Sequence, residues 1–214
     1  MRLDARSAKQ AAESCLTLAR QHDLGLWLLI APAVHGWAVA ALDDAKPAGW
    51  DQLRRSLEVC REQGQKLGAT WFLPQLALAE ARAGRHEIAL RTIESTIDDK
   101  VDLHFSDSEP HRIRGTIFRI RDPASTEMAE AAYFAAVSVA RQGSARSFEL
   151  RAALALAKLY QSTGRPAEAH GVLAPALEGF APTPEMPEIA EAHALLAAVD
   201  SDSVNVGGRL SAGS

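Results

Sequence analysis

The densest group of side chains that could bind a metal or transfer protons is a run of acids and histidines near the middle of the chain. It comprises Asp98, Asp99, Asp102, His104, Asp107, Glu109 and His111. Such side chains make a metal site when one helix face fixes their spacing. This run crosses a predicted loop, so nothing aligns its members. We interpret it as a solvated loop and predict no metal and no cofactor.

Other catalytic motifs are missing from the sequence. It contains no G-x-x-x-x-G-K-[ST] phosphate loop, no G-x-G-x-x-G turn and no G-x-S-x-G nucleophile elbow. Cys15 and Cys60 fall within helical patterns and have no second pair at zinc-finger spacing, so we interpret them as small buried hydrophobes. We therefore predict a protein that is not an enzyme, and a catalytic site assembled only in space stays an open alternative.

An internal repeat sets the positions of the remaining candidate residues. Small residues recur 40 positions apart at Gly49, Ala89, Ala129 and Ala169. Each is followed by a bulkier apolar residue four positions later, at Leu53, Ile93, Tyr133 and Leu173, and by a small residue seven positions later, at Ser56, Thr96, Ala136 and Ala176. These spacings lie on one helical stripe, so a neighbouring helix can approach closely there.

Helical spacing of apolar residues covers almost the whole chain, and no segment alternates like a strand. The predicted helices are 8–22, 26–42, 50–63, 70–83, 86–98, 110–121, 125–142, 147–163, 166–177 and 185–199. Gly64 and Gly143 follow two of these helices, where a left-handed residue is expected. Residues 201–214 are rich in Ser, Gly, Asp and Asn, which predicts a disordered tail.

The repeat resembles the tetratricopeptide repeat family. The resemblance rests on the small, large, small stripe and, in the last copy, on Leu156, Ala157 and Tyr160 before Gly164. Copy two departs from the family pattern with Glu80 where the last copy has Tyr160, and the period is longer than the family's ~34 residues. The resemblance implies an all-α, right-handed superhelical solenoid of about four helical hairpins in one domain, 1–200. The hairpins would be 24–66, 67–106, 107–144 and 145–182, with capping helices 5–22 and 185–199.

From Ser144 through Pro175 the sequence is also similar to the C-terminal helical repeats of large bacterial regulators. Those proteins join a cyclase-type or DNA-binding domain to a signalling ATPase domain. The link 181–187 departs from their pattern, which leaves the orientation of the last helix open. The resemblance implies a sensor or docking arm in signalling, without cyclase or ATPase activity.

Composition limits the partners. The 214 residues are 47% hydrophobic and 23% charged, with a net charge of −4 and a pI near 6.0, so a nucleic-acid partner is not expected. The richest apolar run, 24–42, is interrupted by Pro32, His35 and Gly36, so we expect no membrane span. The beginning of the chain does not resemble a signal peptide, and the expected location is cytoplasmic. Self-association through an exposed end helix stays open.

The concave groove of such a solenoid is the predicted binding site. On the first helix of copy three, one stripe (Ile113, Ile117 and Ile120) is predicted to face the core, and the adjacent stripe is predicted to face the groove. The candidate groove residues are His35, Trp71, Gln75, Arg82, His111, Arg114, Phe118, Arg121, Arg151, Lys158 and Gln161. Five of them are cations, so the expected partner is a protein or peptide segment, acidic in the sharpest form of the hypothesis. A solvated face without function, and a small-ligand sensor that uses the same groove, are the alternatives.

Overall fold

The computed structural model describes residues 4–42, 47–65, 69–98, 107–183 and 186–211, and every regular element in these ranges is an α-helix. Helical periodicity therefore identified the fold class correctly. The chain divides into two compact units, unit 1 (Met1–Asp102) and unit 2 (Leu103–Ser214). The sequence predicts a single domain over 1–200, and the stacking of all hairpins into one solenoid stays a prediction.

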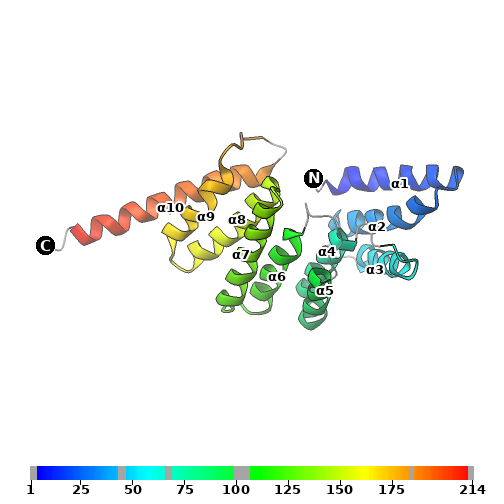
Figure 1. The fold of residues 1–214 in the computed structure, drawn as a ribbon, viewed down its shortest axis with the longest axis horizontal. Coiled ribbons are helices and arrows are strands. Elements are labelled where there is room, and N and C mark those ends of the chain that lie inside the picture. Colours follow the sequence, from blue (N-terminus) through cyan, green and yellow to red (C-terminus); the bar gives the residue numbers. More distant parts are fainter. Residues whose placement is uncertain (1–3, 43–46, 66–68, 99–106, 184–185, 212–214) are drawn as a thin grey trace. The chain divides into compact units, whose positions relative to one another are not determined.

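Unit 1 contains five helices that lie side by side in chain order (Figure 1). They are α1 (Ala5–Gln21), α2 (Gly25–Leu42), α3 (Pro47–Glu62), α4 (Ala69–Arg82) and α5 (His86–Asp98). Helix α2 packs against both α1 and α3, and α4 packs against α5. The side chain of Asp4 caps α1 by accepting hydrogen bonds from the backbone N–H groups of Arg6 and Ser7.

Unit 2 also contains five helices (Figure 1). They are α6 (Ser108–Arg121), α7 (Thr126–Gln142), α8 (Arg146–Ser162), α9 (Pro166–Leu177) and α10 (Pro187–Ser211). Consecutive helices pack together, and α8 also contacts α6 and α10. Helix α8 is thus the centre of unit 2, and its buried Leu150, Leu156 and Tyr160 belong to one core cluster with residues of α7, α9 and α10.

The helix ends agree with the sequence prediction to within three residues, except at the C-terminus. The prediction ends the last helix at Val199, whereas α10 continues to Ser211. The disordered tail from Ser201 onward stays a prediction. Residues 212–214 lie outside the described residues. Extending an existing helix adds one backbone hydrogen bond for each residue that becomes ordered. Residues 201–211 contain no proline, so every one of them can donate such a bond.

The small residues that begin each copy of the stripe, Gly49, Ala89, Ala129 and Ala169, are buried, as predicted. Ala89, Ala129 and Ala169 have almost no exposed surface. At Gly49 the fit is so close that a Cβ atom would lie 2.4 Å from the backbone nitrogen of Ala40 on α2. These positions therefore fix how closely two helices approach and do not face a ligand.

A left-handed backbone conformation is predicted at Gly64 and Gly143, and the structure has it at Gly64 only. Gly64 has φ of 68°, but Gly143 has φ of −82°, and Ser144 takes the left-handed conformation with φ of 51°. The prediction for Gly143 is wrong because the left-handed turn lies one residue later than glycine placement suggests. A serine in this region is strained, since its Cβ approaches the backbone.

Helix α2 agrees with its predicted span of 26–42 to within one residue. Pro32 does not interrupt it, and the carbonyl oxygen of Pro32 accepts a hydrogen bond from the Gln52 side chain of α3. Within the described part of the chain, α2 alone is long and apolar enough to cross a membrane by length and composition. Buried core helices meet the same test, so the expectation of no membrane span stays a prediction.

Candidate functional site

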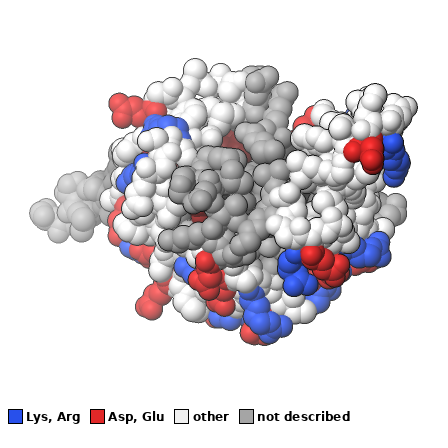
Figure 2. Space-filling model, turned by 45° about the vertical axis from the view of Figure 1, so that its right-hand side comes forward, with Lys and Arg blue, Asp and Glu red and all other residues white. Residues whose placement is uncertain are grey.

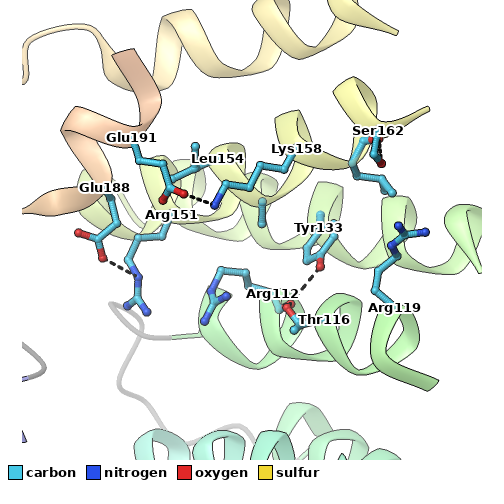
Figure 3. A pocket seen from close by; sticks show the side chains of 12 residues that line it. Arg112, Thr116, Arg119, Tyr133, Arg151, Leu154, Lys158, Ser162, Glu188 and Glu191 are labelled. Atoms are coloured by element: carbon cyan, nitrogen blue, oxygen red, sulfur yellow. Dashed lines mark hydrogen bonds and ion pairs between the residues drawn. The ribbon is translucent and has the colours of Figure 1, made fainter. Parts of the chain in front are cut away.

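A cleft in unit 2 brings charged and hydroxyl side chains together between α6, α8 and α10 (Figure 3). Its volume is about 480 Å³. It is lined by Arg112, Thr116, Arg119, Tyr133, Arg151, Leu154, Ala155, Lys158, Leu159, Ser162, Glu188 and Glu191. Four of these side chains are cations that come from α6 and α8, and both carboxylates come from α10.

A buried carboxylate holds two of the cations in place. Glu109, at the start of α6, is 1% exposed, and Arg112 donates two hydrogen bonds to it at 2.9 and 2.7 Å. Arg151 of α8 donates a third, at 3.0 Å. Glu109 therefore connects α6 to α8, and it directs both guanidinium groups along one wall of the cleft.

Burial alone would raise the pKa of Glu109, but the two guanidinium groups outweigh that effect and hold its pKa below the ordinary value. Glu109 is consequently ionised at neutral pH. The prediction that Glu109 lies in a solvated loop is wrong, because it belongs to the first turn of α6 and is buried. The sequence gives no warning of its burial, because one of its two partners lies 42 residues away.

The acidic edge of the cleft is the first part of α10. Glu191 lies 2.6 Å from the ammonium group of Lys158, and Glu188 lies 3.7 Å from Nε of Arg151 (Figure 3). Buried Ile189 and Ala192 attach this part of α10 to the core. The backbone of α10 is thus fixed, whereas the side chains of Lys158 and Glu191 remain half-exposed.

Hydroxyl groups occupy the middle of the cleft. Tyr133 of α7 and Thr116 of α6 are joined by a hydrogen bond of 3.3 Å between their oxygens. Gly115 makes this placement possible, since a Cβ there would lie 2.6 Å from the Tyr133 ring. Burial raises the pKa of Tyr133, so its hydroxyl stays protonated and can act as a hydrogen-bond donor.

Arg119 differs from the other cations of the cleft. Its guanidinium group donates to the backbone carbonyl of Pro123, and no carboxylate among the described residues pairs with it. In Figure 3 it lies at the end of the cleft opposite Glu188 and Glu191. A ligand carboxylate could therefore bind to Arg119 without displacing an internal carboxylate.

Only two of the predicted groove residues, Arg151 and Lys158, line this cleft. On α6 the predicted stripe (His111, Arg114, Phe118 and Arg121) is half-buried elsewhere, and the cleft is lined by the adjacent stripe Arg112, Thr116 and Arg119. Phe118 packs against the core cluster, and Arg121 lies over its ring at 5.6 Å. Burial, followed by the charge of Arg114, lowers the pKa of His111.

The other predicted groove residues lie apart from the cleft. His35 of α2 is half-buried and contacts Gln52 of α3 at 3.2 Å and Glu13 of α1 at 3.5 Å, so it bridges three helices. In α4, Trp71 is buried, Gln75 is half-buried and Arg82 is exposed. Gln161 of α8 is half-buried outside the cleft lining. Of the four predicted cations that belong to unit 2, only Arg151 and Lys158 therefore line the cleft, and the fifth, Arg82, belongs to unit 1.

Sequence reasoning missed the other residues of the cleft. Arg112, Thr116 and Arg119 have spacings of four and three, so periodicity could have found their stripe but could not choose it over its neighbour. Glu188 and Glu191 gave no signal, because the orientation of α10 was open. Figure 2 shows acidic and basic side chains interspersed on the face in view, and charge alone would not have located the cleft there.

Metal binding finds no support in the described residues, among which no three His, Cys, Asp or Glu side chains form a group that could hold an ion. Asp99, Asp102 and His104 of the acidic run lie outside the described residues. Comparison of the chain with protein-family models, with curated proteins and with solved structures finds no match.

Proposed function

We propose that the chain is a non-catalytic interaction module whose unit 2 cleft binds a peptide or protein segment that carries carboxylate groups. The observation that carries this proposal is the convergence of Arg112, Arg119, Arg151 and Lys158 on one cleft. Arginine presents a planar fork of donors that matches a carboxylate, and its guanidinium group stays charged at any physiological pH.

The four cations of the cleft differ in how available they are to a ligand, because some of them already pair with carboxylates of the chain. Glu109 fixes Arg112 and Arg151, so these two shape the wall of the cleft and contribute positive potential. Lys158 is half-exposed, and a ligand carboxylate can compete with Glu191 for it in water. Arg119 has no carboxylate partner among the described residues, so it is the proposed anchor.

The resemblance to tetratricopeptide repeats and to the arms of bacterial regulators supports the same role. It remains a sequence-based argument, because no family model matches the chain. A part in bacterial signalling, a cytoplasmic location and self-association through an end helix stay predictions.

The test compares a short peptide of alternating Ala and Glu with the corresponding Ala and Gln peptide by isothermal titration calorimetry. We expect the acidic peptide to bind more tightly, and we expect Arg119→Gln to weaken it about tenfold, as the loss of one charged hydrogen-bond pair requires. Lys158→Gln should have a smaller effect because Glu191 already neutralises this cation.

Arg91→Gln is the matched control, because Arg91 is an exposed arginine of α5 in unit 1. It removes the same charge and leaves the cleft intact. Equal affinity for the two peptides, or equal losses in Arg119→Gln and Arg91→Gln, would show that the cleft is not the binding site.

A further inference from the structure

A second hollow lies in unit 1, in the seam between α3, α4 and α5, and its chemistry differs from that of the cleft. Its volume is about 340 Å³. The apolar side chains that line it are Leu57, Cys60, Leu73, Leu76 and Ile88. Leu57, Cys60 and Leu76 are buried, whereas Ile88 is 43% exposed and marks the mouth.

The repeat register explains why this seam is hollow. Position 80 of α4 is equivalent to position 160 of α8, two periods later. In unit 2 the ring of Tyr160 is buried in the core, and its hydroxyl donates to Glu130 of α7 at 3.0 Å. In unit 1 the equivalent residue is Glu80, whose carboxylate binds Arg54 of α3 at 2.5 Å and also Arg85. A carboxylate is smaller than a phenol ring, so the exchange removes volume from the seam.

The mouth of the hollow is apolar where the last copy of the repeat carries a charge. Ile88, the third residue of α5, corresponds to Glu168, the third residue of α9. Glu168 is exposed and accepts two hydrogen bonds from Arg165 at 2.6 Å. Unit 1 thus has an apolar side chain at the mouth, where the last copy of unit 2 has the charged pair of Glu168 and Arg165.

The two buried polar groups of the hollow already have partners, and the charged side chains of Glu58 and Arg61 lie exposed at its edge. Two arginines neutralise Glu80, and the Cys60 thiol donates to the carbonyl of Leu29 at 3.5 Å. Burial raises the pKa of this thiol, so it remains an uncharged wall of the hollow. A charged group that reached the apolar interior would have to lose its hydration there, because both buried polar groups are already paired.

We propose that this seam is a binding site for a compact, neutral, apolar small molecule. Its volume lies at the lower end of the range of about 300–1,000 Å³ that is typical of small-molecule sites. All residues of this site belong to unit 1, and the site is independent of the function proposed for the cleft of unit 2.

The experiment adds 1-octanol to the whole chain and follows the side-chain methyl groups by NMR. We expect saturable shifts of the methyl signals of Leu57, Leu73, Leu76 and Ile88. Octanoate has the same chain but carries a charge, and we expect it to bind about tenfold more weakly, since its carboxylate resists burial.

Two variants locate the site. Thr92 is half-buried in the wall of the hollow, so the ring in Thr92→Phe should occupy the space that octanol would fill. We expect octanol to lose most of its buried apolar contact and to bind about tenfold more weakly. Ile88→Glu places the charge of unit 2 at the mouth and should also weaken binding. Because Ile88 is exposed, Ile88→Glu should fold, and it still tests the site if Thr92→Phe does not fold.

Met128→Glu is the matched control, because Met128 is the third residue of α7, one period after Ile88, and is 44% exposed. It should leave octanol binding unchanged. The proposal is overturned if octanol does not shift the four methyl signals, or if Ile88→Glu and Met128→Glu change its affinity equally.

Discussion

Units 1 and 2 have different side chains at equivalent positions near the end of a helix. Where unit 1 has Glu80 between Arg54 and Arg85, unit 2 has the ring of Tyr160, with Arg165 lying over it at 4.3 Å and Glu130 bound to its hydroxyl. Arg85 and Arg165 occupy the same register position. Both arrangements connect the end of one helix to the turn that follows, but only the aromatic ring also fills the seam.

The comparison extends to the carboxylates of the two cavities. Glu80 and Glu109 are both buried and both bind two arginines. The partners of Glu80 are 37% and 51% exposed, whereas those of Glu109 are 18% and 17% exposed. Water can therefore replace Glu80 far more easily than it can replace Glu109, and the predictions below depend on this difference.

Glu109→Gln should have the largest effect, because it leaves two poorly solvated guanidinium groups without a counter-charge. We expect it to lower the free energy of unfolding by about 4 kcal/mol in urea denaturation. Glu80→Gln should lower it by about 1 kcal/mol, since its arginines are solvated. Equal losses in the two variants would remove the distinction between the two carboxylates.

Acidification gives a second readout of Glu109. Its pKa is lowered in the folded state, so its contribution to stability is present above its unfolded pKa and is lost as the pH falls through the folded pKa. The stability of the parent protein should therefore decline on acidification more steeply than that of Glu109→Gln.

Tyr160→Ala should have the next largest effect, about 3 kcal/mol, because it removes a buried ring and leaves a cavity. Thermal and urea denaturation measure the loss. The same variant should create in unit 2 a hollow like that of unit 1, with new octanol shifts in residues of α7 and α8. A destabilised variant without these shifts would show that position 80 does not account for the hollow.

Gly49→Ala should cost about 2 kcal/mol, because its Cβ would collide with the backbone of Ala40. In a solvent-exposed helix a change from Gly to Ala stabilises the fold. The sign of the change in unfolding free energy therefore shows whether Gly49 is closely packed. Ala129→Gly, at the equivalent position of unit 2, should cost only about 1 kcal/mol through helix propensity. Stabilisation by Gly49→Ala in urea denaturation would contradict the close packing of α2 and α3.

Ser144→Gly should have the smallest effect, a gain of about 0.5 kcal/mol in unfolding free energy, since glycine adopts the left-handed conformation without strain. Gly64 occupies the equivalent position of unit 1, and Gly64→Ser should reverse the sign. Differential scanning calorimetry of the pair measures both changes. Changes of equal sign would contradict the equivalence of the two turns.

Local patterns predicted the helices well, because apolar periodicity and turn residues act over short distances. The bounds of α5 and α9 agree with the prediction at both ends, and the small residues that begin each copy of the stripe are buried. The cleft was harder to predict because it depends on side chains that meet from distant helices. Periodicity left two candidate stripes on α6, and only the pairing of Glu109 with Arg151 shows which one faces α8.

The paired side chains at the ends of α4 and α8 also affect how such a chain could evolve by duplication. Arg54 belongs to the hairpin before Glu80, and Glu130 belongs to the hairpin before Tyr160. A copied or transplanted hairpin would therefore arrive without the residue that its neighbour supplied. Although the small-residue stripe is common to all copies, the hairpins are not interchangeable, and recombination in this chain would have to move them in neighbouring pairs.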